Sequence, residues 1–259
     1  MDLVEAFRAE DASVAVVGAG GKKTTMYALA ERTERAVVTA TVRIPIFDDE
    51  VARVETTADP VTTVRDAADD AFPLGVVPER EREDRYRGYD VEVVDDLIDA
   101  HDGPVLIKAD GARLREFKAP NGTEPRIPDG VDVVVPVVSA GVVGEPLTDE
   151  LVHRPERVVR TAREAGVDAA IGQPISPETV GAVIASPDGG LKDVPAGATA
   201  IPLVNKVDDD ERERAARDVA EAIRAELGDR PDFGPGPIDV PQVVLGRMLD
   251  AAIVGTVRC

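Results

Sequence analysis

The chain has 259 residues, with 30 basic and 50 acidic side chains and a formal net charge of −20 at pH 7. A chain of this length can bury a large apolar core, so one domain can account for residues 1–259. Nucleic-acid backbones attract clustered cations, and single-strand readers stack bases on aromatic rings. The acidic balance, with 5 Phe, 3 Tyr and no Trp, therefore excludes a general nucleic-acid binder.

The composition also bears on the environment of the protein. Only 6 of the 30 cations are Lys, and this acid-rich, Lys-poor composition is typical of a protein that stays soluble at high salt, although a cationic partner would also fit. The single cysteine, Cys259, permits neither an intrachain disulfide nor a cysteine-rich metal site. No apolar run of about 18 residues occurs, and the first residues are acidic, so we expect a cytoplasmic protein with no membrane partner.

Short Val-rich runs alternate with amphipathic segments, a pattern typical of βαβ units. Strands are predicted at 13–18, 36–41, 73–78, 104–110, 131–138, 198–205 and 241–246, and helices at 23–32, 91–100, 155–165, 177–184 and 209–227. The charged segment 79–90 is expected to be a solvated helix or loop, and 111–130 and 229–241 are expected to be irregular loops. The sequence thus predicts a single α/β domain with a mostly parallel β-sheet flanked by helices.

The first predicted strand runs into a glycine-rich turn that opens a helix. Glycines allow close approach of the backbone, the N–H groups at a helix start point at an anion, and lysine adds charge. The turn departs from G-x-x-x-x-G-K-[ST], because Val16 stands five residues before Gly21. A dinucleotide loop would need a third glycine at Lys23, and a purely structural turn is the other alternative. We predict a phosphate-binding loop made of Gly18, Ala19, Gly20, Gly21, Lys22, Lys23, Thr24 and Thr25, with Lys22 in the loop, also serving catalysis, and Lys23 on the first helical turn.

A carboxylate follows the fourth predicted strand. The apolar run Val105 to Ile107 leads to Asp110, which puts an acid at the carboxyl edge of the sheet. An aspartate in this position commonly holds Mg²⁺. Taken alone, Asp110 is better explained as a strand-end turn, but beside a phosphate loop we expect it to bind metal and take part in catalysis.

A short polar segment follows the sixth predicted strand. The carboxylate of Asp208 can accept two hydrogen bonds from a guanine base, while Asn205 and Lys206 brace the ring and the loop. A strand that ends in an Asx turn has the same appearance. The segment favours GTP as the bound nucleotide and leaves ATP open.

Together these segments resemble the YqeC-type accessory family associated with selenium-dependent molybdenum hydroxylases. The resemblance rests on VGAGGKKTTMYALA (17–30), TATVRIP (39–45), ADGARLREFKAPNGTEPRIP (109–128), GVVGEPLTDELVHRPERV (141–158) and LVNKVDD (203–209). It implies a P-loop-like, Mg²⁺-dependent NTPase that assists maturation of a molybdenum hydroxylase or its cofactor. The partner implied is a molybdenum hydroxylase or a cofactor-maturation enzyme.

Two residues depart from the family pattern. Similar proteins read GAGGKTT in the loop, so Lys23 stands where a Mg²⁺-binding hydroxyl would follow the lysine. Thr24 is our preferred replacement as metal ligand, and a shift by one residue that makes Lys23 the phosphate lysine is an equal alternative. Similar proteins also have an acid two residues before Asp110, where this chain has Lys108.

Further residues have two interpretations each. His153 opens a predicted helix, either as a surface residue or as a general base. Thr39, Thr41 and Arg43 either line the nucleotide pocket or favour the strand, and 118–125 is either a surface loop or a loop beside the phosphates. Three functions remain open: an NTPase, a non-hydrolysing nucleotide-binding scaffold, and a nucleotidyl or phosphoryl transferase acting on a pterin.

Overall fold

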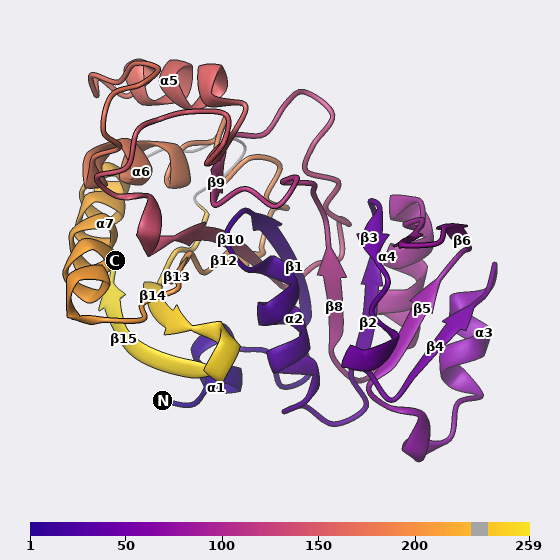
Figure 1. The fold of residues 1–259 in the computed structure, drawn as a ribbon. Helices are drawn as coiled ribbons and strands as arrows, with labels where there is room; N and C mark the ends of the chain where they lie inside the picture. The colour runs from indigo at the N-terminus through magenta and orange to yellow at the C-terminus, as the bar shows by residue number, and fades with distance from the viewer. Residues whose placement is uncertain (229–237) are drawn as a thin grey trace.

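The computed structural model describes residues 1–228 and 238–259, and a ten-stranded sheet lies at its centre (Figure 1). The strands of this sheet are β1 (Ser13–Gly18), β2 (Val37–Ala40), β4 (Arg53–Thr56), β5 (Leu74–Val77), β8 (Val105–Lys108), β10 (Val133–Ser139), β12 (Thr199–Ala200), β13 (Leu203–Asn205), β14 (Gln242–Arg247) and β15 (Ala252–Arg258). Two small sheets contain β3 (Ile44–Pro45), β6 (Arg80–Arg82) and β7 (Arg85–Tyr86), and β9 (Phe117–Lys118) and β11 (Val152–His153).

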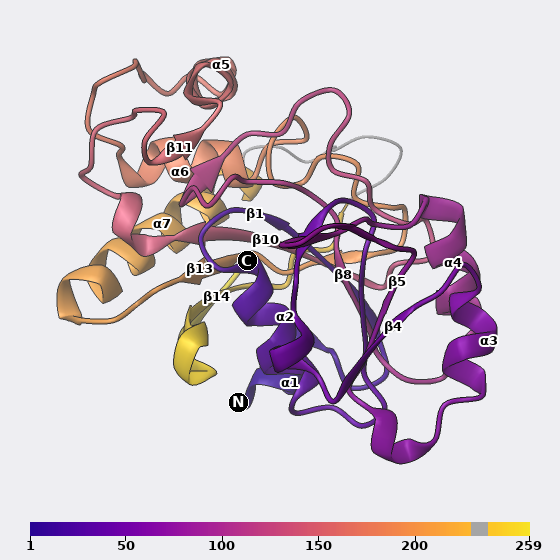
Figure 2. The ribbon, with the colours of Figure 1, turned by 45° about the vertical axis from the view of Figure 1, so that its right-hand side comes forward.

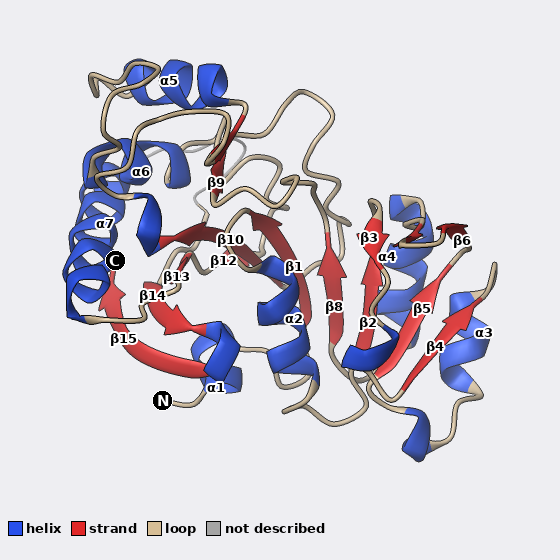
Figure 3. Cartoon of the chain, viewed as in Figure 1, coloured by secondary structure: helices blue, strands red, loops and turns tan. Residues whose placement is uncertain are grey.

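The strands of the large sheet run in the order β15-β14-β13-β10-β1-β8-β2-β5-β4, with β12 beside β10 (Figure 3). All the described pairings in it are parallel except that of β14 with β15. Parallel strands need crossover connections, and helices supply most of them here. The predicted fold class, a mostly parallel sheet flanked by helices, is therefore confirmed, and the fold is consistent with that of P-loop NTPases.

Helices cover both faces of the sheet (Figure 2). They are α1 (Leu3–Phe7), α2 (Lys22–Ala30), α3 (Pro60–Arg65), α4 (Val91–Ala100), α5 (Pro155–Glu164), α6 (Pro177–Ile184) and α7 (Asp210–Gly228). Val16 of β1 shares a core with Met26 of α2, whereas the adjacent Ala15 shares a different core with Leu97 of α4. Because successive side chains of a strand point to opposite faces, α2 and α4 lie on opposite sides of the sheet.

Most predicted elements are present with shifts of one or two residues at their ends. The predictions for β1, α4 and α6 are confirmed at both ends. The predicted strand 104–110 ends earlier, at Lys108. The predicted strand 198–205 is two strands, β12 and β13, because Pro202 between them has no N–H to donate to a neighbouring strand. Most of the predicted loop 229–241 lies outside the described residues, and 111–130 is irregular apart from β9.

The prediction of a helix or loop at 79–90 was wrong. β6 and β7 form an antiparallel hairpin there, and β7 also pairs with β3. Tyr86 is the anchor, since it is 4% exposed and its hydroxyl donates to Asp48 at 2.7 Å. The charged side chains on both sides of Tyr86 obscure the alternation of apolar and polar residues that is typical of a strand. The edge strands β4 and β15 and the short helices α1 and α3 were also not predicted.

The topology brings several strand ends together. β1 lies between β8 and β10, and the chain reaches β8 only after it has formed β2, β4 and β5 on one side. It then crosses to β10 on the other side. Ligands of open α/β sheets bind where the strand order reverses in this way, outside the carboxyl ends of the strands.

Candidate functional site

The turn between β1 and α2 has a backbone that suits only glycine. Gly18, Gly20 and Gly21 have φ angles of 90°, 89° and 133°, which residues with a side chain rarely adopt. A Cβ on Gly20 would lie 2.7 Å from the backbone nitrogen of Ser139, and one on Gly21 would collide with the Asn205 amide. The turn is thus held closely between the ends of β10 and β13.

This turn leads directly into the N-terminus of α2. The helix begins at Lys22, one residue earlier than predicted, so Lys22 and Lys23 both lie on its first turn. Its N-cap, Gly21, has no side chain to cap the helix, and the first N–H groups of a helix have no intrahelical partner. Ala19 donates its N–H to Val137 at 2.8 Å and so fixes the turn to β10. A glycine turn followed by an uncapped helix start can bind phosphate.

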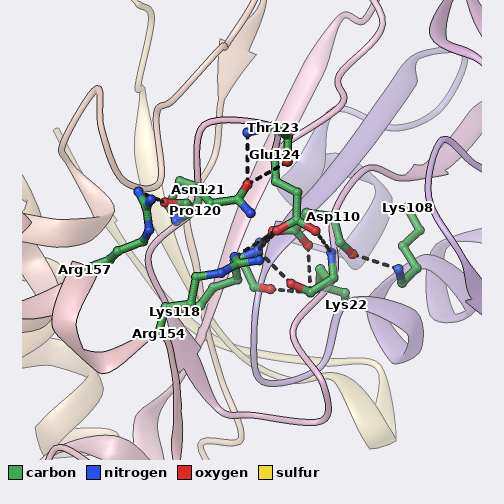
Figure 4. Close-up of polar contacts among 12 residues, drawn as sticks. Lys22, Lys108, Asp110, Lys118, Pro120, Asn121, Thr123, Glu124, Arg154 and Arg157 are labelled. Atoms are coloured by element: carbon green, nitrogen blue, oxygen red, sulfur yellow. Dashed lines mark hydrogen bonds and ion pairs between the residues drawn. The ribbon is translucent and has the colours of Figure 1, made fainter. Parts of the chain in front are cut away.

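Asp110 lies behind this turn and is 1% exposed (Figure 4). Its Oδ1 is 2.8 Å from Nζ of Lys22, and its Oδ2 is 2.8 Å from Nζ of Lys118 and accepts the N–H of Gly18 at 2.8 Å. Burial alone would raise the pKa of Asp110, but the two ammonium groups outweigh it and lower the pKa to about 2. The carboxylate is therefore ionised at neutral pH and joins the turn to two lysines.

An outer layer of charges completes this cluster. Lys118 of β9 donates to the carbonyl of Gly111 at 2.7 Å and lies 3.3 Å from Oε2 of Glu124. Arg154 donates to the same oxygen of Glu124 at 2.9 Å (Figure 4). The segment 118–125 is thus tied to the aspartate behind the turn, and its place beside phosphates stays a prediction.

Lys108 is a third lysine beside Asp110. It is 7% exposed, and its Nζ donates to the backbone carbonyls of Arg43 at 2.8 Å and of Asp110 at 2.7 Å. These bonds fix the segment after β2 to the segment after β8. Burial, reinforced by the charge of Lys22, lowers the pKa of Lys108 to about 7.

This lowered pKa predicts a dependence of stability on pH. Because the pKa of Lys108 is lower in the folded protein than in the unfolded chain, the unfolded chain binds more protons between about pH 7 and 10. The free energy of unfolding is therefore expected to rise over this range. We expect Lys108→Met to reduce that rise, measured as urea denaturation of both proteins at pH 7, 8 and 9; part should remain, because burial lowers the pKa of Lys22 as well. Parallel pH profiles of the two proteins would contradict the shift.

A cavity of about 450 Å³ opens over the first turn of α2, and we call it the cationic cavity. Its charged lining contains one acid, Glu116, and eight cations: Lys22, Lys23, Arg43, Arg85, Lys108, Arg113, Arg115 and Lys206. Among the described residues, Lys23, Arg113 and Arg115 have no ion-pair partner, whereas Lys22, Arg43, Arg85 and Lys206 pair with carboxylates. In a chain of net charge −20 with 6 lysines, this cavity gathers four of them. The cavity is suited to a ligand with several negative charges.

The predicted base-recognition segment divides between two places. Asn205 is 3% exposed, and its Nδ2 donates to the carbonyl of Gly20 at 2.9 Å. Lys206 lines the cationic cavity and lies 2.6 Å from Oε1 of Glu116. Asp208 instead points to Arg212 of α7, 2.5 Å away, and does not line the cavity. The structure thus brings Asn205 and Lys206, but not Asp208, to the glycine turn.

The remaining predicted residues lie around this site. Thr24 lines the cationic cavity together with Arg43, while Thr25 is buried and bonds back to the carbonyl of Gly21 at 3.0 Å. Thr39 and Thr41 are buried and donate to backbone carbonyls of Val76 and Arg126, at 2.9 and 2.6 Å, so both hydroxyls are engaged in holding strands and loops.

His153 lies in β11, where it pairs with Lys118 of β9. Burial and the nearby charge of Arg154 lower the pKa of His153 to about 4, so its imidazole is neutral at pH 7. The ring does not belong to the lining of the cationic cavity.

The residues predicted to hold Mg²⁺ do not by themselves fit a divalent cation. Both oxygens of Asp110 are paired with lysines, and the described residues contain no group of three or more His, Cys, Asp or Glu side chains that could hold a metal ion. The ammonium groups of Lys22 and Lys118 on this one carboxylate repel a cation. A metal ion would need a ligand that brings its own negative charge.

Comparison with known proteins assigns the chain to a family. The model of the YqeC protein family matches residues 14–156. The chain belongs to the YqeC family. An uncharacterised protein YqeC from Escherichia coli (strain K12) is 27% identical over 207 residues, which cover 74% of this chain and 75% of that protein. The region matched by the family model, residues 14–156, contains the glycine turn, Asp110 and the outer charges of Lys118, Glu124 and Arg154.

Two features of this YqeC-family site were not predicted. The acid of the cavity, Glu116, stands among cations in an irregular segment, and no sequence pattern marks it. Arg85 belongs to the hairpin that was taken for a helix or loop.

The described helices include none that is both long enough and apolar enough to cross a membrane.

Proposed function

We propose that this protein binds a nucleoside triphosphate, with its phosphates over the first turn of α2 in the cationic cavity. The observation that carries the proposal is the position of eight cations around a glycine turn and an uncapped helix start. Four of these cations have no ion-pair partner among the described residues. Lys108 instead donates to two backbone carbonyls, and phosphate oxygens would neutralise the other three, Lys23, Arg113 and Arg115. Lys206 lines this cavity, whereas Asn205 is buried beside the glycine turn, and GTP is kept as the proposed nucleotide.

The proposal extends to hydrolysis through Glu116. One oxygen of this carboxylate faces Lys206, and the other, Oε2, is buried with no hydrogen-bond partner among the described residues. A carboxylate on the cavity wall can orient a water molecule and accept its proton. Lys22 would neutralise charge that develops on the transferred phosphoryl group. A phosphoryl or nucleotidyl transferase acting on a pterin would use the same cations with an acceptor in place of water.

Mg²⁺ enters this proposal only as a counter-ion of the nucleotide, with Thr24 as a nearby hydroxyl. Because Asp110 is already paired with Lys22 and Lys118, we assign no step to a metal ion. The resemblance to the family adds an accessory role in maturation of a molybdenum hydroxylase or its cofactor, and we propose a cytoplasmic location from the composition alone. A non-hydrolysing scaffold is the second candidate, favoured by the position of His153 outside the cavity lining.

Hydrolysis can be separated from binding with one variant. In high-salt buffer, GTP is expected to raise the melting temperature of the wild type, since a ligand of the native state stabilises it by mass action. Glu116→Gln should keep this rise but release phosphate at least about 100-fold more slowly, because it removes the proton acceptor. Glu150→Gln, on an exposed residue away from the cavity, is the matched control and should resemble the wild type.

Each result has a distinct meaning. If GTP, ATP and inorganic triphosphate all leave the melting temperature unchanged, the binding proposal is wrong. If they raise it and the wild type releases no phosphate, the scaffold is the better description.

A further inference from the structure

A second cavity lies against the first turn of α2. It has a volume of about 500 Å³, and its wall includes η4 (Met248–Asp250), which follows β14. Lys23 and Thr24 line this cavity and the cationic cavity alike. The two cavities therefore adjoin at the helix start, where one elongated ligand can reach both.

The two cavities differ in charge. The charged lining of the second holds two cations, Lys23 and Arg32, and four acids, Glu31, Asp49, Glu50 and Asp250, and we call it the acidic cavity. A nucleotide has the matching polarity, with a polyanionic end and a base and ribose that carry N–H and O–H donors. Carboxylates accept hydrogen bonds from such donors and repel phosphates.

Tyr27 supplies an unused polar atom to the acidic cavity. The side chain lines the cavity and is 9% exposed, and its hydroxyl is buried with no hydrogen-bond partner among the described residues. Burial raises the pKa of Tyr27, and the nearby Glu50 adds to this, so the hydroxyl stays protonated. An unsatisfied buried hydroxyl is costly, and a ligand in the cavity would provide the missing partner.

Asn205 connects the wall of the acidic cavity to the glycine turn. Its Nδ2 donates to the carbonyl of Gly20 at 2.9 Å, and its Oδ1 accepts the N–H of Met248 at 3.0 Å. Both groups are buried, so this one amide fixes η4 relative to the phosphate-binding turn. Leu249 on η4 is 88% exposed and lines the cavity, where its apolar side chain can cover the face of a base.

From these contacts we infer that the acidic cavity binds the base and ribose of the nucleotide, with Asp250 and Tyr27 as the groups that recognise the base. The inference rests on the proposed function, because it needs the phosphates to occupy the cationic cavity. A carboxylate that accepts two hydrogen bonds selects guanine, which offers N1–H and the 2-amino group side by side, over adenine. This assigns to Asp250 the role that the sequence suggested for Asp208.

The experiment compares ligands that share the phosphates and differ in the base. Binding of inorganic triphosphate, GTP and ATP is measured by calorimetry in high-salt buffer. The wild type should bind GTP at least about tenfold more tightly than triphosphate, which is the effect of one or more hydrogen bonds to a charged group. Asp250→Asn should remove most of this difference, and Tyr27→Phe part of it, while both leave triphosphate affinity within about twofold.

Two control variants test whether the GTP preference depends on the carboxylate of Asp250. Arg247 pairs with Asp250 at 2.5 Å, so Arg247→Gln breaks this ion pair but keeps the acid, and it should bind GTP like the wild type. Asp208→Asn tests the other carboxylate and should also bind like the wild type. Asp250 is on the surface, and its variant should keep the melting temperature of the ligand-free protein.

The failures are distinguishable. Loss of the GTP preference in Asp208→Asn, with no effect of Asp250→Asn, would overturn the inference and leave the proposed function intact. Equal affinities of the wild type for GTP and triphosphate would also overturn the inference and leave the proposed function intact. A wild type that binds neither ligand would overturn both.

Discussion

Lys22→Met is expected to lower the affinity for inorganic triphosphate and GTP by about 100-fold, since a hydrogen bond to a charged group contributes about 1.5–3 kcal/mol. Lys22 is 6% exposed at the helix start, where its ammonium group lies between Asp110 and the carbonyl of Gly18. Phosphates bound over the first turn of α2 would contact this ammonium group as their main positive charge. Lys23 lines both cavities from their rim, so Lys23→Met should cost less than about tenfold.

The matched control for Lys22→Met is Lys118→Met. Lys118 pairs with the same carboxylate of Asp110 but does not line the cationic cavity. Both variants weaken the buried cluster, so both should lower the melting temperature, and only Lys22→Met should also weaken nucleotide binding. If Lys23→Met proves more damaging to binding, Lys23 is the phosphate lysine and Lys22 serves mainly to neutralise Asp110.

The parts of the fold that the sequence predicted are those with strong local signals. The seven apolar runs predicted as strands account for eight strands of the large sheet, and glycines at Gly18, Gly20 and Gly21 marked the turn whose φ angles are positive. The same turn predicted the place of a ligand site, because a glycine-rich turn at a helix start can bind an anion. Asn205 was also singled out correctly as a residue of this neighbourhood, although its contact with Met248 was not foreseen.

The other parts depend on contacts between distant segments. Nothing near Asp110 in the sequence shows that Lys22 and Lys118 both reach its carboxylate, and Glu124 and Arg154 join the cluster from still other loops. The strand β15 was missed although its sequence, AIVGTVR, is apolar and β-branched and favours a strand; it lies at the sheet edge beside β14, and most of its residues are only half-buried. The cluster around Asp110, by contrast, follows from the assembled sheet and not from any local pattern.

The cluster around Asp110 predicts the largest effect on stability. Asp110→Asn leaves Lys22 and Lys118 buried without their shared carboxylate, and removal of one partner from a buried ion pair costs about 3–5 kcal/mol. We expect a fall of this size in the free energy of unfolding, measured by urea denaturation at pH 7. Asp110→Asn/Lys118→Met removes one of the excess charges and should recover part of the loss, as a double-mutant cycle would reveal.

The charge of Asp110 should also make the free energy of unfolding depend on pH in acid. The pKa of Asp110 is about 2 in the folded protein, below its ordinary value of 3.8, so the stability that it contributes is complete above about pH 4 and is lost as the pH falls toward 2. The shift corresponds to about 2 kcal/mol, which the wild type should lose over this range and Asp110→Asn should not. Because the many other carboxylates titrate in both proteins, the difference between the two stability profiles isolates Asp110. A constant difference between pH 2 and 7 would mean that its carboxylate is not held by Lys22 and Lys118.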